Sequence, residues 1–159
     1  MTPLTLGSSA PDVEIPATGG QSINLTNFKG RFIVLYFYPK DSTPGCTLEG
    51  RDFGAHIDRF QAMNAVVFGV SRDSLRSHEN FKCKQAFPFD LLSDPDETLC
   101  RLFDVVKMKN MYGKQVRGIE RSTFLFDPQG ILVREWRKVT VKTHVAEVLR
   151  ALSELAAPQ

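Results

Sequence analysis

The sequence lacks several features that mark other classes of protein. No apolar run approaches the roughly 18–20 residues of a membrane span. The N-terminal segment has neither a basic n-region nor an apolar h-region, so no secretory signal is visible and we expect a cytoplasmic protein. The formal net charge of +2 is too small to indicate nucleic acid or an acidic membrane by itself. We therefore expect neither kind of partner.

Motifs for cofactors are also absent. There is no G-x-x-x-x-G-K-[ST] loop and no G-x-G-x-x-G after a strand, and His56, His78 and His144 have no metal-ligand spacing. We expect no cofactor and no metal. Cysteine is scarce, with three in the chain, and no C-x-x-C occurs, which counts against a thioredoxin-type disulfide exchanger. In a reducing compartment, an odd number of cysteines indicates chemistry or core filling rather than a disulfide framework.

What is present is typical of a globular α/β protein. The 159 residues are 42% hydrophobic and 24% charged, without repeats or linkers, which predicts a single domain over 1–159. The run RFIVLYFY at 31–38 is continuously apolar, as in a strand buried on both faces. The basic stretch around 107–117 is interpreted as a solvated loop. Further strands are predicted at 65–70, 90–92, 122–127 and 131–139, and helices from Thr43-Pro44 through Phe60, at 74–86 and at 141–155.

Strands that alternate with helices predict a central sheet covered on both sides. The last two strands are separated by a short turn at 128–130, which adds an antiparallel edge. A turn at Thr18-Gly19-Gly20 lies between two short apolar segments and predicts a small hairpin near the N-terminus. The expected architecture is a mixed five-stranded sheet flanked by helices, with this N-terminal hairpin appended.

One cysteine stands where a thiol becomes reactive. Thr43 and Pro44 form a helix-start signal, which places Cys46 near the third residue of a helix directly after the buried strand. The first amides of a helix have no internal partner and the dipole there is positive, so both favour a thiolate. Ionisation alone gains only about thirtyfold over an ordinary thiol. An enzyme whose cysteine displaces an oxygen leaving group would also need donors aimed at the departing oxygen, each worth about 10²–10³.

The residues around Cys46 resemble a known family. Pro39, Thr43 and Cys46 stand as P-x-x-x-T-x-x-C, and FYPKDSTPGCTLEGRDF closely resembles the peroxiredoxins of the bacterioferritin-comigratory (peroxiredoxin Q) branch. The likeness extends to G-x-x-A-P-D at 7–12, to MYGKQVRGIERSTFLFDPQG at 111–130, and to WRKV at 136–139 with the Thr143-His144 pair. The resemblance implies a thioredoxin-like fold and reduction of hydrogen peroxide or organic hydroperoxides.

The same resemblance implies a role for each matching residue. Cys46 is the nucleophile that becomes a sulfenic acid, and Thr43 orients the peroxide through its hydroxyl. Pro39 shields the sulfur from water, and Arg121 holds both thiolate and peroxide oxygen, as a permanent charge with a fork of donors can. Thioredoxin is the expected reductant, with glutaredoxin and glutathione left open, and members of this branch are often monomers. The alternative function is a peroxide sensor or holdase that uses the same cysteine without turnover.

The chain departs from the branch in its second cysteine. Many members carry one five residues after the first, where this chain has Arg51. Cys83 is the next candidate to resolve the sulfenic acid, although relatives place that cysteine at the position of Lys82, about 100° around the helix. Cys83 is either the resolving thiol or a bystander. If Phe81 is buried, Cys83 is the more exposed of the two. Cys100 stands among apolar residues and is predicted to be core filler.

Two glycines in the helix of Cys46 leave a second question open. Gly50 and Gly54 each weaken a helix by roughly 1 kcal/mol relative to alanine. Either they let its first two turns open readily, or they allow close packing of another segment against the helix.

Overall fold

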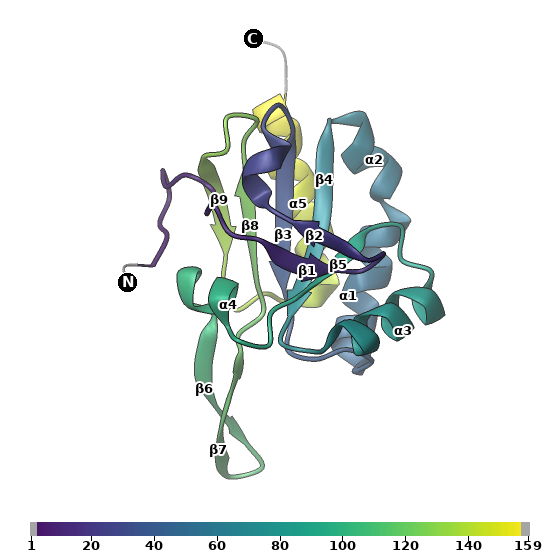
Figure 1. Ribbon diagram of the computed structural model, residues 1–159, viewed down its shortest axis with the longest axis vertical. Helices are drawn as coiled ribbons and strands as arrows, with labels where there is room; N and C mark the ends of the chain where they lie inside the picture. Colours follow the sequence, from purple (N-terminus) through teal and green to yellow (C-terminus); the bar gives the residue numbers. More distant parts are fainter. Residues whose placement is uncertain (1–2, 157–159) are drawn as a thin grey trace.

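A mixed sheet runs through the centre of the protein, which the computed structural model describes over residues 3–156 (Figure 1). Its strand order is β2-β1-β5-β4-β3-β8-β9, in which β3, β4 and β5 are parallel and the remaining pairs antiparallel. The elements are β1 (Ile15–Ala17), β2 (Gln21–Ile23), the 3-10 helix η1 (Leu25–Phe28), β3 (Phe32–Phe37), α1 (Pro44–Ala55), α2 (Ile57–Ala62), β4 (Ala65–Ser71), α3 (Leu75–Gln85), β5 (Asp90–Ser93), α4 (Thr98–Leu102), β6 (Val106–Met111), β7 (Lys114–Ile119), β8 (Ser122–Phe126), β9 (Leu132–Trp136) and α5 (Val141–Ala156).

This topology confirms the predicted α/β architecture. Strands β5, β4, β3, β8 and β9 form the expected five-stranded mixed sheet, and the N-terminal hairpin β1–β2 extends it beside β5. Strand β3 lies at the centre and every one of its residues is buried. Alternate residues enter two different cores, with Val34 and Tyr36 in one and Ile33 and Leu35 in the other. The continuous apolar run was therefore a correct sign of a strand covered on both faces.

The two faces of the sheet are covered by different elements. Helices α1 and α5 pack on each other and supply Phe53, Val148 and Leu152 to the first core, which also contains Cys46. The N-terminal hairpin, η1 and α4 cover the other face in Figure 1. None of the helices within residues 3–156 is both long and apolar enough to cross a bilayer.

The predicted helix from Thr43 through Phe60 is divided in two. Helix α1 ends at Ala55, and His56 has non-helical dihedral angles of −109° and 12° before α2 begins. The amide of His56 donates to the carbonyl of Phe53, three residues back, which tightens the last turn and ends the helix there. The apolar spacing was correct, because Phe53 and Phe60 are both buried on the sheet side.

The stretch around 107–117 is a β-hairpin and not a loop, although it is solvated as predicted. Strands β6 and β7 pair with each other alone, and in Figure 1 they project away from the body. Tyr112 and Gly113 both have positive φ, as in the two-residue turns that match strand twist. The carboxylate of Glu97 anchors the hairpin by binding both Arg117 and Arg72. Periodicity missed the hairpin because most of its side chains are exposed and no face is consistently apolar.

Gly50 and Gly54 lie where another segment packs closely on α1. A Cβ at Gly50 would come 2.4 Å from Cζ of Phe87, and one at Gly54 would come 3.1 Å from Cδ of Pro88. The close-packing alternative is therefore present in the structure, while opening of the helix stays a prediction.

Replacing Gly50 with alanine is expected to destabilise the protein by about 1–2 kcal/mol, since overpacking outweighs the gain in helix propensity. Gly54→Ala is the matched control, and we expect it to be close to neutral because its neighbour has only a few tenths of an ångström to move. Urea unfolding of the reduced proteins measures both, and equal stability of the two variants would contradict the packing account.

Candidate active site

Cys46 lies at the first turn of α1, where the chain leaves the carboxyl end of β3. Pro44 occupies the first helical position and Cys46 the third, as the sequence predicted. The Cys46 residue is 2% exposed, while Pro39 and Thr43 beside it in the chain are partly exposed. Its sulfur therefore lies at the inner end of a site whose rim is formed by the loop between β3 and α1.

Arg121 reaches this sulfur from a strand that is distant in sequence. Phe37 at the end of β3 pairs with Ser122 at the start of β8, so Arg121 enters the sheet beside the loop that leads to Cys46. Its Nη2 lies 3.4 Å from Sγ of Cys46, and the side chain is 16% exposed. A Cβ on Gly45 would lie 3.2 Å from the same Nη2, so glycine leaves room for the guanidinium. The structure thus places a fixed positive charge against the thiol at the positive end of a helix.

Glu49 belongs to this site and the sequence analysis missed it. Its Oε1 accepts a hydrogen bond of 2.5 Å from Nη1 of Arg121, and the residue is 1% exposed. Its Oε2 has no hydrogen-bond partner within residues 3–156. Burial raises the pKa of Glu49 to about 7, against the opposing attraction of Arg121. Its position three residues after Cys46, on the same face of a helix, is the signal that could have identified it.

Thr43 occupies the N-cap position but does not cap the helix with its side chain. Its hydroxyl donates to the carbonyl of Lys40 at 2.8 Å instead. With its proton used in this way, the hydroxyl oxygen has only lone pairs to offer, so it can accept a hydrogen bond from a bound molecule.

Lys109 from the projecting hairpin lies near the site. It is partly buried, and its Nζ donates to the carbonyl of Ile119. Burial, then the positive charge of Arg121, lowers the pKa of Lys109, while Cys46 is among the groups that oppose this shift. A second basic residue, on an element that was expected to be a solvated loop, therefore interacts electrostatically with Arg121 and Cys46.

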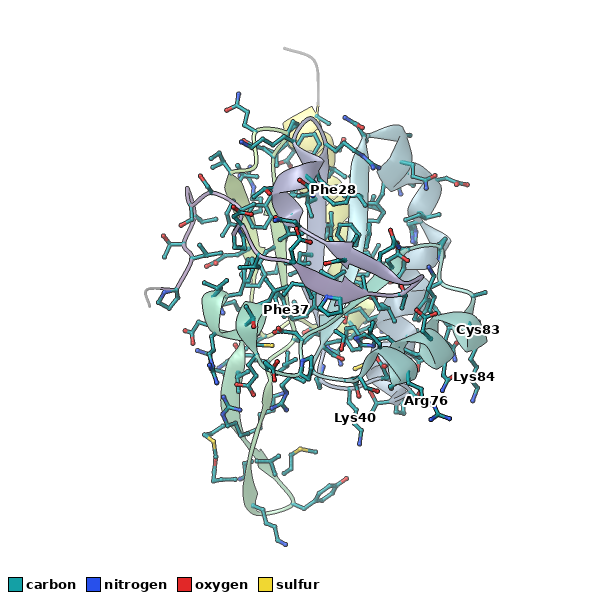
Figure 2. The ribbon with its side chains drawn as sticks, in the orientation of Figure 1. Phe28, Phe37, Lys40, Arg76, Cys83 and Lys84 are labelled. Atoms are coloured by element: carbon teal, nitrogen blue, oxygen red, sulfur yellow. The ribbon has the colours of Figure 1, made fainter. Side chains whose placement is uncertain are left out.

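All three cysteines are free thiols, and they differ in exposure. Cys83 is exposed on α3, next to Lys84 on the outer side of the molecule (Figure 2), whereas Phe81 is buried, so Cys83 is the more exposed of the two, as expected for a buried Phe81. Cys83 and Cys46 therefore do not meet in this conformation. Cys100 is fully buried among apolar residues, which confirms its interpretation as core filler, and burial followed by Asp94 raises the pKa of its thiol.

Asp41, Asp73 and His78 have ligand-type atoms close enough together for a metal ion. Those atoms already have protein partners: Asp41 accepts from Tyr38 and Ser77, and Asp73 accepts from Ser71 and the amide of Asp41. His78 contacts Asp41 through one ring nitrogen and the carbonyl of Leu92 through the other. Hydrogen bonding within the protein accounts for the cluster, so it gives no reason to assign a metal.

Comparison with known proteins places this site in a family. The AhpC/TSA family profile matches residues 6–135. Peroxiredoxin Bcp of Xanthomonas campestris is 55% identical over 94% of this chain and 93% of its own, and Peroxiredoxin Bcp of Bacillus subtilis is 49% identical over 96% and 98%. A solved structure of Xanthomonas campestris bacterioferritin comigratory protein superposes with a TM-score of 0.90 at 53% identity, over 97% of this chain and 98% of that one.

A second solved structure, a variant of Xylella fastidiosa PrxQ, gives a TM-score of 0.92 at 42% identity over 99% of this chain and all of that one. These likenesses span nearly the whole chain, and they confirm the thioredoxin-like α/β fold predicted from the sequence. The chain therefore belongs to the AhpC/TSA family and is a peroxiredoxin, a thiol-dependent peroxidase.

Proposed function

We propose that Cys46 is the sulfur that attacks the hydroperoxide. The observation that supports this most strongly is the 3.4 Å contact between Nη2 of Arg121 and its Sγ, at the start of a helix. Cys83 has no such surroundings, and the buried Cys100 has a raised pKa that keeps it a thiol. Among the three cysteines, all within residues 3–156, Cys46 is the one with a guanidinium hydrogen-bonded to its sulfur, and it also lies in the first turn of α1; both features favour the thiolate that acts as nucleophile.

In the proposed step, a lone pair of the Cys46 thiolate forms a bond to the terminal oxygen of the hydroperoxide as the O–O bond breaks. The departing alkoxide takes up the proton released from the attacked oxygen, so the products are an alcohol and a sulfenate, which becomes the sulfenic acid by taking up a proton from solvent. Arg121 stabilises the negative charge that moves from sulfur to the departing oxygen. Thr43 accepts a hydrogen bond from the peroxide, and Pro39 keeps water from the sulfur.

Organic hydroperoxides are the substrates we propose, together with hydrogen peroxide. The Xanthomonas campestris protein at 53% identity has been described for its alkyl peroxide reduction activity. Cys46 belongs to an apolar core cluster, and apolar surroundings suit a substrate that carries an alkyl group.

We propose that Cys83 then resolves the sulfenic acid. Its thiolate attacks the Cys46 sulfur as the S–O bond breaks, a disulfide forms, and the departing hydroxide takes up a proton to become water. A thioredoxin dithiol then supplies two electrons and two protons that restore both thiols, and it becomes a disulfide itself. The exposure of Cys83 suits exchange with a protein reductant. Since Cys46 is buried, the first turns of α1, the C-terminal part of α3, or both must rearrange for the two sulfurs to meet. The working unit proposed is the monomer.

Continuous turnover tests this function. With thioredoxin, its reductase and NADPH, we expect the protein to consume hydroperoxide catalytically, and Cys46→Ser to be inactive at the same concentration. Glutaredoxin and glutathione in parallel assays identify the donor. A single stoichiometric oxidation that no thiol donor reverses would contradict catalysis and indicate a sensor.

The resolving role of Cys83 gives a separate prediction. After one equivalent of hydroperoxide, mass spectrometry is expected to show a Cys46–Cys83 linkage in the wild type and in the control Cys100→Ser. Cys83→Ser is expected to stop at the sulfenic acid and to lose at least about 90% of thioredoxin-supported turnover. A wild-type protein without the linkage would show that an external thiol resolves Cys46.

A further inference from the structure

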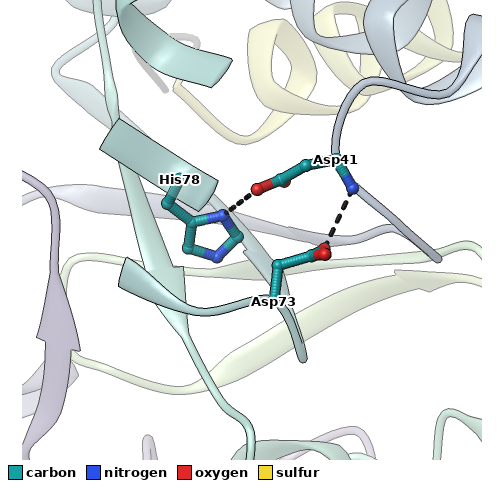
Figure 3. A group of neighbouring side chains, drawn as sticks. All are labelled: Asp41, Asp73 and His78. Carbon is teal, nitrogen blue, oxygen red and sulfur yellow. Dashed lines mark hydrogen bonds and ion pairs between the residues drawn. The ribbon is translucent and has the colours of Figure 1, made fainter. Parts of the chain in front are cut away.

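A buried hydrogen-bond network joins the loop before α1 to α3 (Figure 3). The carboxylate of Asp41 contacts Nδ1 of His78 at 2.7 Å, and the amide of Asp41 donates to Asp73 at 2.9 Å. On its other side, the ring of His78 contacts the carbonyl of Leu92 in β5 at 2.9 Å. His78 is fully buried and Asp41 is 5% exposed, so water does not compete for these bonds.

The partners of His78 determine how many protons this network holds. A carbonyl oxygen only accepts, so Nε2 of His78 carries a proton that it donates to Leu92. At Nδ1 the partner is a carboxylate oxygen, and a lone pair there would face another lone pair at 2.7 Å. One further proton therefore lies between His78 and Asp41. Tyr38 and Ser77 donate their own hydroxyl protons to the Asp41 carboxylate, at 2.6 and 2.8 Å. These protons do not replace the one between His78 and Asp41.

This shared proton connects the two segments that carry the reaction. Asp41 lies in the loop between Pro39 and Thr43, whose conformation places Cys46 at the start of α1. His78 lies in the first half of α3, the helix that carries Cys83. The contact exists only while this loop and α3 keep their present arrangement, so it favours that arrangement over any in which α3 moves away.

We propose that Asp41 and His78 are positioning residues that share one buried proton and clasp the loop of Pro39 and Thr43 to the helix of Cys83. The clasp holds the peroxide-reactive arrangement and opposes the rearrangement that brings Cys83 to Cys46. This inference rests on the proposed roles of the two cysteines, but its test uses reduced protein without peroxide.

The groups that face His78 are Asp41 in the loop, Tyr38 directly after β3 and Asp73 before α3, with no cation among these contacts in residues 3–156. Burial keeps Tyr38 neutral because it raises the pKa of that phenol. The shared proton therefore compensates the charge of the buried Asp41 carboxylate, and movement of α3 away from the loop would leave that carboxylate without its ring partner.

Asp41→Asn keeps the hydrogen bonds between the loop and α3 but does not need the shared proton. The amide group of asparagine can donate to Nδ1 of a neutral His78 and to Oγ of Ser77, while its oxygen still accepts from Tyr38. The clasp would then form without the shared proton. His78→Gln removes the contact between the His78 ring and Asp41. The matched control is His56→Gln, which changes a half-buried histidine directly after α1.

Hydrogen exchange of the reduced proteins at about pH 7, followed by mass spectrometry, tests the proposal through the protection of α3 relative to that of β3. We expect this relative protection to stay within about twofold of the wild type in His56→Gln and in Asp41→Asn, which keeps the contact, and to fall at least about tenfold in His78→Gln. Unchanged relative protection of α3 in His78→Gln, or a fall in Asp41→Asn as large as in His78→Gln, would overturn the clasp, whereas a missing Cys46–Cys83 linkage would overturn only the resolving role.

Discussion

Arg121→Met is expected to slow the oxidation of Cys46 by hydroperoxide about 10²–10³-fold, the cost of removing one donor to developing oxygen charge. The guanidinium lies 3.4 Å from the sulfur, so its loss removes both a charge that favours the thiolate and a donor to the departing oxygen. In this variant the buried carboxylate of Glu49 would lose the cation that binds it. We therefore place the substitution in a Glu49→Gln background, which avoids an unpaired buried charge.

Rapid quenching and mass analysis of the reduced protein measure the rate constant of this step alone. Repeating the measurement at about pH 10, where even an ordinary cysteine is largely ionised, separates the two contributions of Arg121. Slowing that persists there reflects lost stabilisation of oxygen rather than a lost thiolate. Arg134→Met, a change to an exposed arginine on β9, is the control. A loss of less than about threefold in the Arg121 variant would show that the guanidinium does not act in this step.

The second large effect concerns stability and Glu49. Because burial raises the pKa of Glu49 to about 7, the folded protein retains a proton that the unfolded chain releases near pH 4.5. The stabilisation that this bound proton gives the folded protein is complete below pH 4.5 and is lost as the pH rises through about 7. We expect the stability advantage of Glu49→Gln over the wild type to grow by roughly 3 kcal/mol across this interval.

Urea unfolding of both proteins at a series of pH values, with reductant present, gives this difference directly. Contributions from ionisable groups that both proteins share cancel in the comparison. Glu154→Gln changes an exposed carboxyl on α5 and should follow the wild type at every pH. Parallel curves for Glu49→Gln and the wild type would mean that Glu49 is ionised throughout, paired with Arg121.

Sequence reasoning succeeded where the local pattern and the fold required the same thing. The apolar run of β3 and the helix-start signal at Thr43-Pro44 placed Cys46 at the right end of the right helix. Bringing Arg121 to the sulfur depends on the pairing of β3 with β8, a contact between segments far apart in the chain. Local spacing contains no information on such pairing, so the position of Arg121 came from family resemblance.

Other features could not be read from the sequence for specific physical reasons. The hairpin β6–β7 has no buried face, so it produces no apolar alternation. Glu49 reads as an ordinary helix-surface residue until the packing shows that it is buried against Arg121. For His78, the sequence showed only the lack of metal-ligand spacing, because its contact with Asp41 joins two segments that only the folded chain brings together.

Trapping the oxidised sulfur is the most direct test of the central claim that Cys46, activated by the helix start and Arg121, attacks the peroxide. Reduced Cys83→Ser protein is treated with one equivalent of hydroperoxide in the presence of dimedone, which captures sulfenic acids, and its peptides are analysed by mass spectrometry. We expect one adduct, located on Cys46. An adduct on Cys100 instead, or an unmodified Cys46 after the peroxide has been consumed, would contradict the account.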